Sequence, residues 1–277
     1  MKDFFGKDAS RLRDKKLYLF DMDGTIYREN DLFFGVKEML KKIKNKGGRY
    51  AFITNNPSKS LCDYMQKLKD MGITDIDESN FFSSAQAAAM VIKERFGKEL
   101  VFVQGTKSFV EGLKKDGLNV TEDFTDNAKV ILVAFDPEIT GNKMRTTCEM
   151  LTKHDLPYYA TNPDWVCPVS FGSVPDCGSM CEGYARATGR TPVYIGKPQP
   201  TMVLELIKKF GVKPEETLVV GDRLYTDIAS GVNAGVDTVC VLCGEVTLLD
   251  IEKAGGNQVP TFVFKDTCNI LEIEKQA

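Results

Sequence analysis

The feature that most constrains this chain is an apolar run that ends in two acids and a glycine, Lys16-Leu-Tyr-Leu-Phe-Asp21-Met-Asp23-Gly24-Thr25. Its apolar residues predict a buried strand. Open α/β sheets bind ligands at the carboxyl ends of their strands, and a glycine there lets the backbone turn and approach a ligand closely. We therefore interpret Asp21 as a nucleophile and Asp23 as its acid/base partner.

Apolar periodicity along the rest of the chain predicts alternating strands and helices. Such alternation implies right-handed crossovers and a parallel sheet, the α/β fold class. Further strands are predicted at 49–54, 100–104, 129–135, 157–161, 191–196, 217–221, 237–242 and 260–264, and helices near 35–46, 60–71, 85–96, 108–115, 143–153, 200–210 and from 227.

The middle of the chain alternates in the same way but does not repeat the acid pair. About 100 residues suffice for a separate α/β domain. We predict a smaller domain at residues 83–186, inserted into a main domain that consists of residues 1–82 and 187–277.

Polar residues follow four of the strands predicted for the main domain. They are Asp21 and Asp23, Thr54 and Asn55, Lys197, and Asp222 and Asp227. Any one of them alone is more simply explained as a helix cap, a turn residue or a solvated lysine. Together, four strand ends in one parallel sheet are expected to converge at one edge.

These residue types suit phosphoryl transfer. The carboxylate of Asp21 can accept a phosphoryl group to form an aspartyl-phosphate. Two anions repel, so a cation must lie between them, and Mg²⁺ prefers oxygen ligands such as the carboxylates of Asp21 and Asp222. Lys197 and the Thr54 hydroxyl can bind phosphate oxygens. Asp23 can protonate the leaving alkoxide and then activate water.

Composition excludes several other classes of protein. Net charge is −3, and lysine and arginine are scattered, so no basic patch for nucleic acid is expected. No apolar run is long enough for a membrane helix, and the first residues lack a signal peptide's apolar core. We expect a cytoplasmic protein whose eight cysteines are reduced structural thiols. The only histidine, His154, ends a helical pattern and is expected to have no catalytic role.

The four polar segments resemble, in order and spacing, the motifs of the haloacid dehalogenase superfamily. The matching stretches are Asp21-Met-Asp23-Gly-Thr, Thr54-Asn55-Asn, Gly-Lys197-Pro and Gly-Asp222-Arg-Leu-Tyr-Thr-Asp227. The resemblance implies a Rossmann-like parallel-sheet core. It implies that Mg²⁺ binds the Asp21 side chain, the Asp23 main-chain oxygen and Asp222, and that phosphate binds Thr54, Asn55 and Lys197. Asp227 would orient Lys197 or a metal-bound water.

The position of the insertion narrows the resemblance. An α/β insertion after the second motif is similar to the type IIA (C2) cap of the NagD-like/4-nitrophenylphosphatase family, whose members are often dimers through the cap. The resemblance implies a Mg²⁺-dependent phosphatase of small phosphate monoesters. Candidate specificity residues in the cap are Gly141, Asp164, Trp165, Cys167 and Pro168.

The substrate and two other functions stay open. Pyridoxal-phosphate-specific relatives carry His-Pro where this chain has Cys167-Pro168, and an aromatic residue where Gly141 falls. This difference disfavours pyridoxal phosphate and leaves sugar phosphates, nucleotides and aryl phosphates. A phosphoryl transferase or mutase is disfavoured by the cap position. A non-catalytic phosphometabolite-binding regulator is disfavoured by the presence of all four motif residues. Trp165 is more simply explained by packing than by stacking on a substrate.

Overall fold

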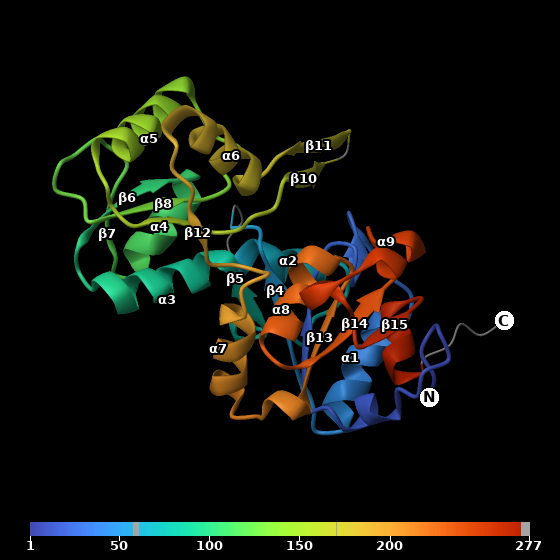
Figure 1. Ribbon diagram of the computed structural model, residues 1–277. Helices are drawn as coiled ribbons and strands as arrows, with labels where there is room; N and C mark the ends of the chain where they lie inside the picture. Colours follow the sequence, from blue (N-terminus) through green and yellow to red (C-terminus); the bar gives the residue numbers. More distant parts are fainter. Residues whose placement is uncertain (58–60, 170, 273–277) are drawn as a thin grey trace. The chain divides into compact units, whose positions relative to one another are not determined.

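The computed structural model describes residues 1–57, 61–169 and 171–272, without the side chain of Pro168. The chain divides into two compact units (Figure 1). Unit 1 comprises Met1–Thr54, Cys62–Phe82 and the described part of Lys197–Ala277, and unit 2 comprises Asn55–Leu61 and Ser83–Gly196.

Unit 1 is built on a six-stranded sheet in the order β15-β14-β13-β1-β4-β5. Four of its neighbouring pairs, from β15 to β4, are parallel. The central strands carry apolar residues that are buried throughout, as expected for a parallel sheet covered on both faces. The strands are β1 (Leu17–Phe20), β4 (Arg49–Thr54), β5 (Phe81–Ser83), β13 (Thr217–Gly221), β14 (Asp237–Val241) and β15 (Phe262–Phe264).

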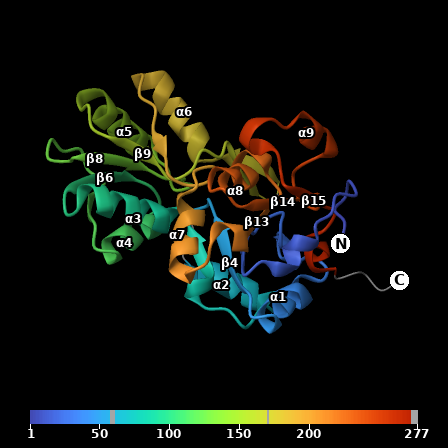
Figure 2. The ribbon, with the colours of Figure 1, turned by 60° about the horizontal axis from the view of Figure 1, so that its bottom comes forward.

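Helices cover both faces of this sheet, with α1 on one side and α8 on the other (Figure 2). Helix α1 shows why: Val36, Met39, Leu40 and Ile43 fall on one face and are buried. The helices are α1 (Val36–Asn45), α2 (Leu61–Asp70), α7 (Thr201–Phe210), α8 (Ala229–Asn233) and α9 (Leu248–Lys253). Short 3₁₀ turns cover Ser10–Asp14, Glu78–Asn80, Pro214–Glu216, Gly256–Gln258 and Thr267–Leu271.

Several local structures in unit 1 were not predicted from the sequence, among them strand β5 and helix α9. A small antiparallel hairpin, β2 (Tyr27–Arg28) and β3 (Asp31–Leu32), follows the first motif. The helix expected from residue 227 begins earlier, as a π-helical turn over Leu224–Ile228 that continues into α8. π-helical turns occur often at functional sites, and this one carries Asp227.

Unit 2 has a parallel five-stranded sheet in the order β12-β9-β8-β6-β7. Its strands are β6 (Leu100–Gln104), β7 (Asn119–Thr121), β8 (Val130–Val133), β9 (Tyr158–Ala160) and β12 (Val193–Tyr194). Its helices are α3 (Ser84–Phe96), α4 (Lys107–Lys115), α5 (Gly141–Lys153) and α6 (Cys177–Thr188), and a hairpin joins β10 (Val166–Val169) to β11 (Gly172–Pro175). Helix α3 begins with a capping box of Ser83 and Gln86.

One strand lies in a different sheet from the one predicted. The strand expected at 191–196 was assigned to the main domain, but β12 pairs with β9 through Val193 and Tyr159 and therefore belongs to unit 2. Its hydrogen-bonded part is only two residues long, and its sequence fits the edge of either sheet equally well. The chain passes from unit 2 to unit 1 between Gly196 and Lys197.

No helix in the part of the chain that the structure describes has the length and apolarity to cross a membrane.

A cluster of charged side chains attaches the N-terminal segment of unit 1 to the sheet, and its effect on stability can be tested. Asp237, at the start of β14, accepts hydrogen bonds from Arg11 at 3.0 and 2.6 Å and pairs with the buried Lys15 at 2.7 Å. Burial alone would raise the pKa of Asp237, but Arg11 and Lys15 lower it below its usual value. The stabilising contribution is therefore present above the unfolded pKa of about 3.9 and is lost as the pH falls through the folded pKa.

We expect Asp237→Asn to lower the free energy of unfolding at neutral pH by about 1–2 kcal/mol, because it removes charged hydrogen bonds and leaves Lys15 without its carboxylate. Urea unfolding at pH 7 and at pH 3 should show the difference shrink at the lower pH. The control is Asp75→Asn, which breaks an ion pair to Lys44 whose aspartate side chain is 86% exposed and should cost no more than about 0.5 kcal/mol. Equal effects of the two variants at pH 7 would contradict the prediction.

Candidate active site

The strand register of unit 1 brings three of the predicted polar segments level with one another. Phe20, the last residue of β1, lies opposite Val220 on β13 and Phe52 on β4. Asp21, Asp222 and Thr54 follow these three positions by one or two residues. The structure therefore brings together at one edge of the sheet the polar ends of β1, β4 and β13.

Lys197 reaches the same edge without a strand of the core sheet behind it. Its ammonium donates to Asp21 Oδ1 at 2.5 Å, to Asp227 Oδ1 at 2.6 Å and to the Ile53 carbonyl at 3.3 Å. The side chain is 1% exposed. Burying an ammonium loses its hydration, which is tolerated only when the group is paired and hydrogen-bonded. Lys197 therefore forms one unit with the two carboxylates.

Asp222 is held from several sides by its surroundings in unit 1. Its Oδ1 accepts from the Thr25 hydroxyl at 3.2 Å, and its Oδ2 accepts from the Glu245 backbone N–H at 2.7 Å. A Cβ on Gly24 would approach Asp222 Oδ2 to 2.3 Å, and one on Gly244 would approach it to 2.1 Å. Gly24 also has a φ of +85°, in the region that favours glycine.

Burial and mutual repulsion perturb the titration of these groups. Burial, and then the charge of Asp227, raise the pKa of Asp21 well above its usual value. The same two causes raise the pKa of Asp222 to about 6. Burial alone would lower the pKa of Lys197, but Asp21 and Asp227 raise it above its usual value. The site has an excess of negative charge that a cation would relieve.

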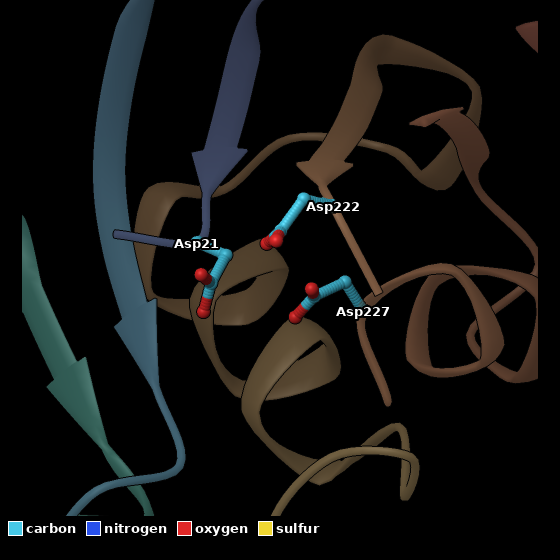
Figure 3. Close-up of side chains that lie close together, drawn as sticks. All are labelled: Asp21, Asp222 and Asp227. Carbon is cyan, nitrogen blue, oxygen red and sulfur yellow. The ribbon is translucent and has the colours of Figure 1, made fainter. Parts of the chain in front are cut away.

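The side chains of Asp21, Asp222 and Asp227 lie close together, and the carboxylates of Asp222 and Asp227 are directed toward Asp21 (Figure 3). One oxygen from each lies within 4.8 Å of the others. Asp222 and Asp227 are buried and Asp21 is partly buried, and three clustered carboxylates fit a hard divalent cation, which prefers oxygen ligands. Asp227 is also bound by Lys197 and by the Arg223 N–H at 3.1 Å, an arrangement in which it holds Lys197 beside the cluster.

Asp23 lies apart from this buried cluster. Its side chain is 61% exposed. Its Oδ2 accepts a hydrogen bond from the Tyr27 hydroxyl at 3.0 Å, and its Oδ1 lies 3.8 Å from the Lys67 ammonium. The two aspartates of the first motif are therefore in different environments.

The second motif is divided between the two units. Thr54 ends β4 in unit 1, whereas Asn55 is grouped with unit 2. The Asn55 amide donates to Asp164 Oδ2 at 2.7 Å, and Asn162 donates to the same oxygen at 2.9 Å. Asp164, a predicted specificity residue, is thus buried in a polar network and holds a residue predicted to bind phosphate.

The remaining residues predicted in the insertion lie at different places in unit 2. Gly141 is the exposed first residue of α5. Trp165 is 54% exposed, next to the β10–β11 hairpin. Cys167 lies on β10 and accepts a long contact of 3.8 Å from the Asn56 amide, while the side chain of Pro168 is outside the described part. His154 caps the end of α5 and stacks on Phe124.

Several residues that shape the site were not found from the sequence. Gly244 and Glu245 carry no recognisable signal, because their contact with Asp222 depends on the loop after β14. Tyr27 belongs to a hairpin that was not predicted from the sequence, and Lys67 belongs to α2, which was predicted only as an element of the fold. The proximity of Tyr27 to the first motif, four residues after Asp23, is the one signal that was available.

Comparisons with known proteins agree with this arrangement. A family model described as haloacid dehalogenase-like hydrolase matches residues 18–119, and one described as HAD-hydrolase-like matches residues 194–269. The acid sugar phosphatase of Staphylococcus aureus is 31% identical over 265 residues, which are 95% of this chain and 100% of that protein.

Two crystal structures extend the comparison. That of a 4-nitrophenylphosphatase from Thermotoga maritima has a TM-score of 0.88 and 36% identity, over 95% of this chain and 98% of the other. That of a glycerol phosphate phosphatase from Mycobacterium tuberculosis in complex with magnesium has a TM-score of 0.88 and 25% identity, over 98% of this chain and 79% of the other.

The chain belongs to the haloacid dehalogenase-like hydrolases. The predicted membership of the NagD-like/4-nitrophenylphosphatase family within that superfamily is confirmed, and so is the predicted fold, a Rossmann-like core with an α/β cap.

The close approach of Gly244 to Asp222 leads to a prediction about the carboxylate cluster. We expect Gly244→Ala to lower affinity for a divalent cation by roughly 10-fold or more, because the added methyl group must displace the Asp222 carboxylate, and such supporting contacts are worth 10- to 100-fold. Calorimetric titration with MgCl₂ measures this. The control is Gly255→Ala, where a Cβ meets nothing within 4 Å. Unchanged affinity in Gly244→Ala would show that Asp222 is not a ligand.

Proposed function

We propose that this protein is a Mg²⁺-dependent phosphatase that hydrolyses small phosphate monoesters through a phosphorylated Asp21. The observation that carries the proposal is the buried Lys197, held at 2.5 Å from Asp21 and 2.6 Å from Asp227 at the edge where Asp222 also lies. The phosphatase names of the relatives from Staphylococcus aureus and Thermotoga maritima support it.

Mg²⁺ would be held by Asp21 and Asp222, together with the main-chain oxygen of Asp23. When bound, it supplies positive charge that lets an anionic phosphate approach a carboxylate. The donor set supports a hard cation, since the clustered ligand atoms are carboxylate oxygens. The magnesium complex of the related glycerol phosphate phosphatase agrees with this choice of metal. Asp227 would keep Lys197 in place.

The chain's own residues carry the two steps of the reaction. In the first, an Asp21 oxygen attacks phosphorus, the bond from phosphorus to the substrate oxygen breaks, and Asp23 gives that oxygen a proton. In the second, water attacks the phosphorylated Asp21 and loses a proton to Asp23. The bond between Asp21 and phosphorus then breaks, and inorganic phosphate is released. Asp21 is therefore regenerated after each turnover.

Phosphate oxygens would be bound by Thr54, Asn55 and Lys197. Lys197 is charged at neutral pH, because two carboxylates stabilise the ammonium, and it has already lost its water shell. Thr54 ends β4 and follows Ile53, whose carbonyl accepts a hydrogen bond from Lys197. Charged donors that are desolvated before the substrate arrives stabilise the transition state without reorganisation.

We further propose that residues 83–186 form the cap and select the substrate, with Gly141, Asp164, Trp165, Cys167 and Pro168 as its specificity residues. The substrate is a small phosphorylated metabolite, and the activities named for the relatives from Staphylococcus aureus and Mycobacterium tuberculosis favour a sugar or polyol phosphate. A homodimer through the cap and a cytoplasmic location stay predictions from the sequence.

One test of the proposed function concerns the nucleophile, Asp21. We expect Asp21→Asn to lower the release of 4-nitrophenol from 4-nitrophenyl phosphate by on the order of 10⁴-fold or more, as in other enzymes that lose their nucleophile. EDTA should abolish the activity of the unchanged protein, and Mg²⁺ should restore it. The control is Asp31→Asn, on exposed β3, which should retain full activity. Full activity in Asp21→Asn would overturn the mechanism.

Another test of the proposed function concerns the acid/base residue, Asp23. We expect Asp23→Asn to lower kcat by roughly 10²- to 10⁴-fold, the usual contribution of general acid/base catalysis. Mg²⁺ affinity should persist, because the amide leaves the main-chain oxygen in place. Steady-state kinetics and MgCl₂ titration measure the two quantities. If the variant instead lost metal affinity and turned over normally at saturating Mg²⁺, Asp23 would be only a ligand.

A further inference from the structure

Tyr27 is a buried residue next to the first motif to which the proposed mechanism gives no role. It begins β2, is 0% exposed, and donates its hydroxyl to Asp23 Oδ2 at 3.0 Å. Its carbonyl accepts from the Gly24 N–H at 2.8 Å. The loop from Asp23 to Tyr27 is therefore closed by one backbone and one side-chain hydrogen bond, which fix the phenol relative to the carboxylate.

Lys67 completes this arrangement from helix α2. Its ammonium lies 3.9 Å from the centroid of the Tyr27 ring and 3.8 Å from Asp23 Oδ1. The first distance is that of a cation–π contact. The second exceeds a direct hydrogen bond, so Lys67 acts on Asp23 as a nearby charge rather than as a donor to Oδ1.

Because Asp23 is exposed, its orientation depends on these contacts. A carboxylate that is 61% exposed is free to change rotamer unless something holds it. Proton transfer requires the acid/base within hydrogen-bond reach of the reacting oxygen, in a fixed orientation. The Tyr27 hydroxyl already donates a hydrogen bond to Oδ2 of Asp23, which leaves Oδ1 to exchange the proton.

We propose that Tyr27 is a positioning residue that holds Asp23 by Oδ2, so that Oδ1 gives a proton to the leaving group and takes one from the attacking water. Lys67 packs over the ring and keeps the phenol in place. This inference rests on the proposed function, because it assigns a partner to the acid/base of that reaction. It adds no bond-making step of its own.

The test uses Tyr27→Phe, which keeps the ring and removes only the hydroxyl. The second step needs Asp23 to take a proton from water, whereas nitrophenolate leaves in the first step with little need of one. With 4-nitrophenyl phosphate we therefore expect kcat to fall by roughly 10-fold, the scale of effect expected when a catalytic group loses its orientation. In a stopped-flow experiment, a burst of nitrophenolate close to one per enzyme should precede the slower steady state.

The matched control is Tyr18→Phe. Tyr18 is also a buried tyrosine of unit 1, and its hydroxyl donates to the Leu12 carbonyl at 3.0 Å. Loss of a buried hydroxyl alone should lower stability in both variants, but only Tyr27→Phe should show the burst. In an Asp23→Asn background Tyr27→Phe should have no further effect on kcat, since a positioning residue acts only through the group it positions.

A second variant keeps the test decisive if Tyr27→Phe does not fold. Lys67→Met retains apolar cover over the ring and removes the charge, and it should lower kcat in the same direction by a smaller factor, with Lys67→Arg restoring it. Unchanged kcat in Tyr27→Phe would overturn the proposal. So would an equally large fall in kcat when Tyr27→Phe is added to Asp23→Asn. If Tyr27→Phe cannot be expressed, unchanged kcat in Lys67→Met would overturn it. Absence of Mg²⁺-dependent hydrolysis in the unchanged protein would instead overturn the proposed function.

Discussion

The buried ammonium of Lys197 is the interaction on which the rest of the site depends. Three carboxylates meet at one edge of the core sheet, and Lys197 contacts two of them, at 2.5 and 2.6 Å. Without it the carboxylates of Asp21 and Asp227 would repel each other in a poorly solvated place, where a charged group is costly unless it is paired. One ammonium against three carboxylates leaves a negative excess, which is the electrostatic complement of a divalent cation.

The geometry of the carboxylate cluster depends on two glycines whose lack of a side chain leaves room for Asp222. Gly24 and Gly244 have no side chain, and a methyl group at either position would meet Asp222 at 2.3 or 2.1 Å. The Thr25 hydroxyl and the Glu245 N–H then fix both oxygens of that carboxylate. As the proposed metal ligand, Asp222 would need little reorganisation on metal binding, which is how supporting residues contribute to metal affinity.

The two aspartates of the first motif lie in environments that suit the different roles proposed for them. Asp21 is 15% exposed and is paired with Lys197, whereas Asp23 is 61% exposed and is held by Tyr27 and Lys67. A nucleophile is helped by a site with little water, and a proton-transfer group must reach both a leaving group and a water molecule. The turn at Gly24 and the β2–β3 hairpin create this difference within a few residues of chain.

The sequence by itself determined the α/β class, most strands and helices, and the motif residues at the sheet edge, because apolar periodicity and the order of polar strand ends are local signals. It could not assign β12 to a sheet, since two paired residues fit either edge. It could not find Gly244, Glu245 or Lys67, whose contacts with Asp222 and Asp23 join residues far apart in the chain. Which residues hold the chemistry in place was decided only by the tertiary structure, because a carboxylate's orientation depends on neighbours that packing, and not sequence order, brings to it.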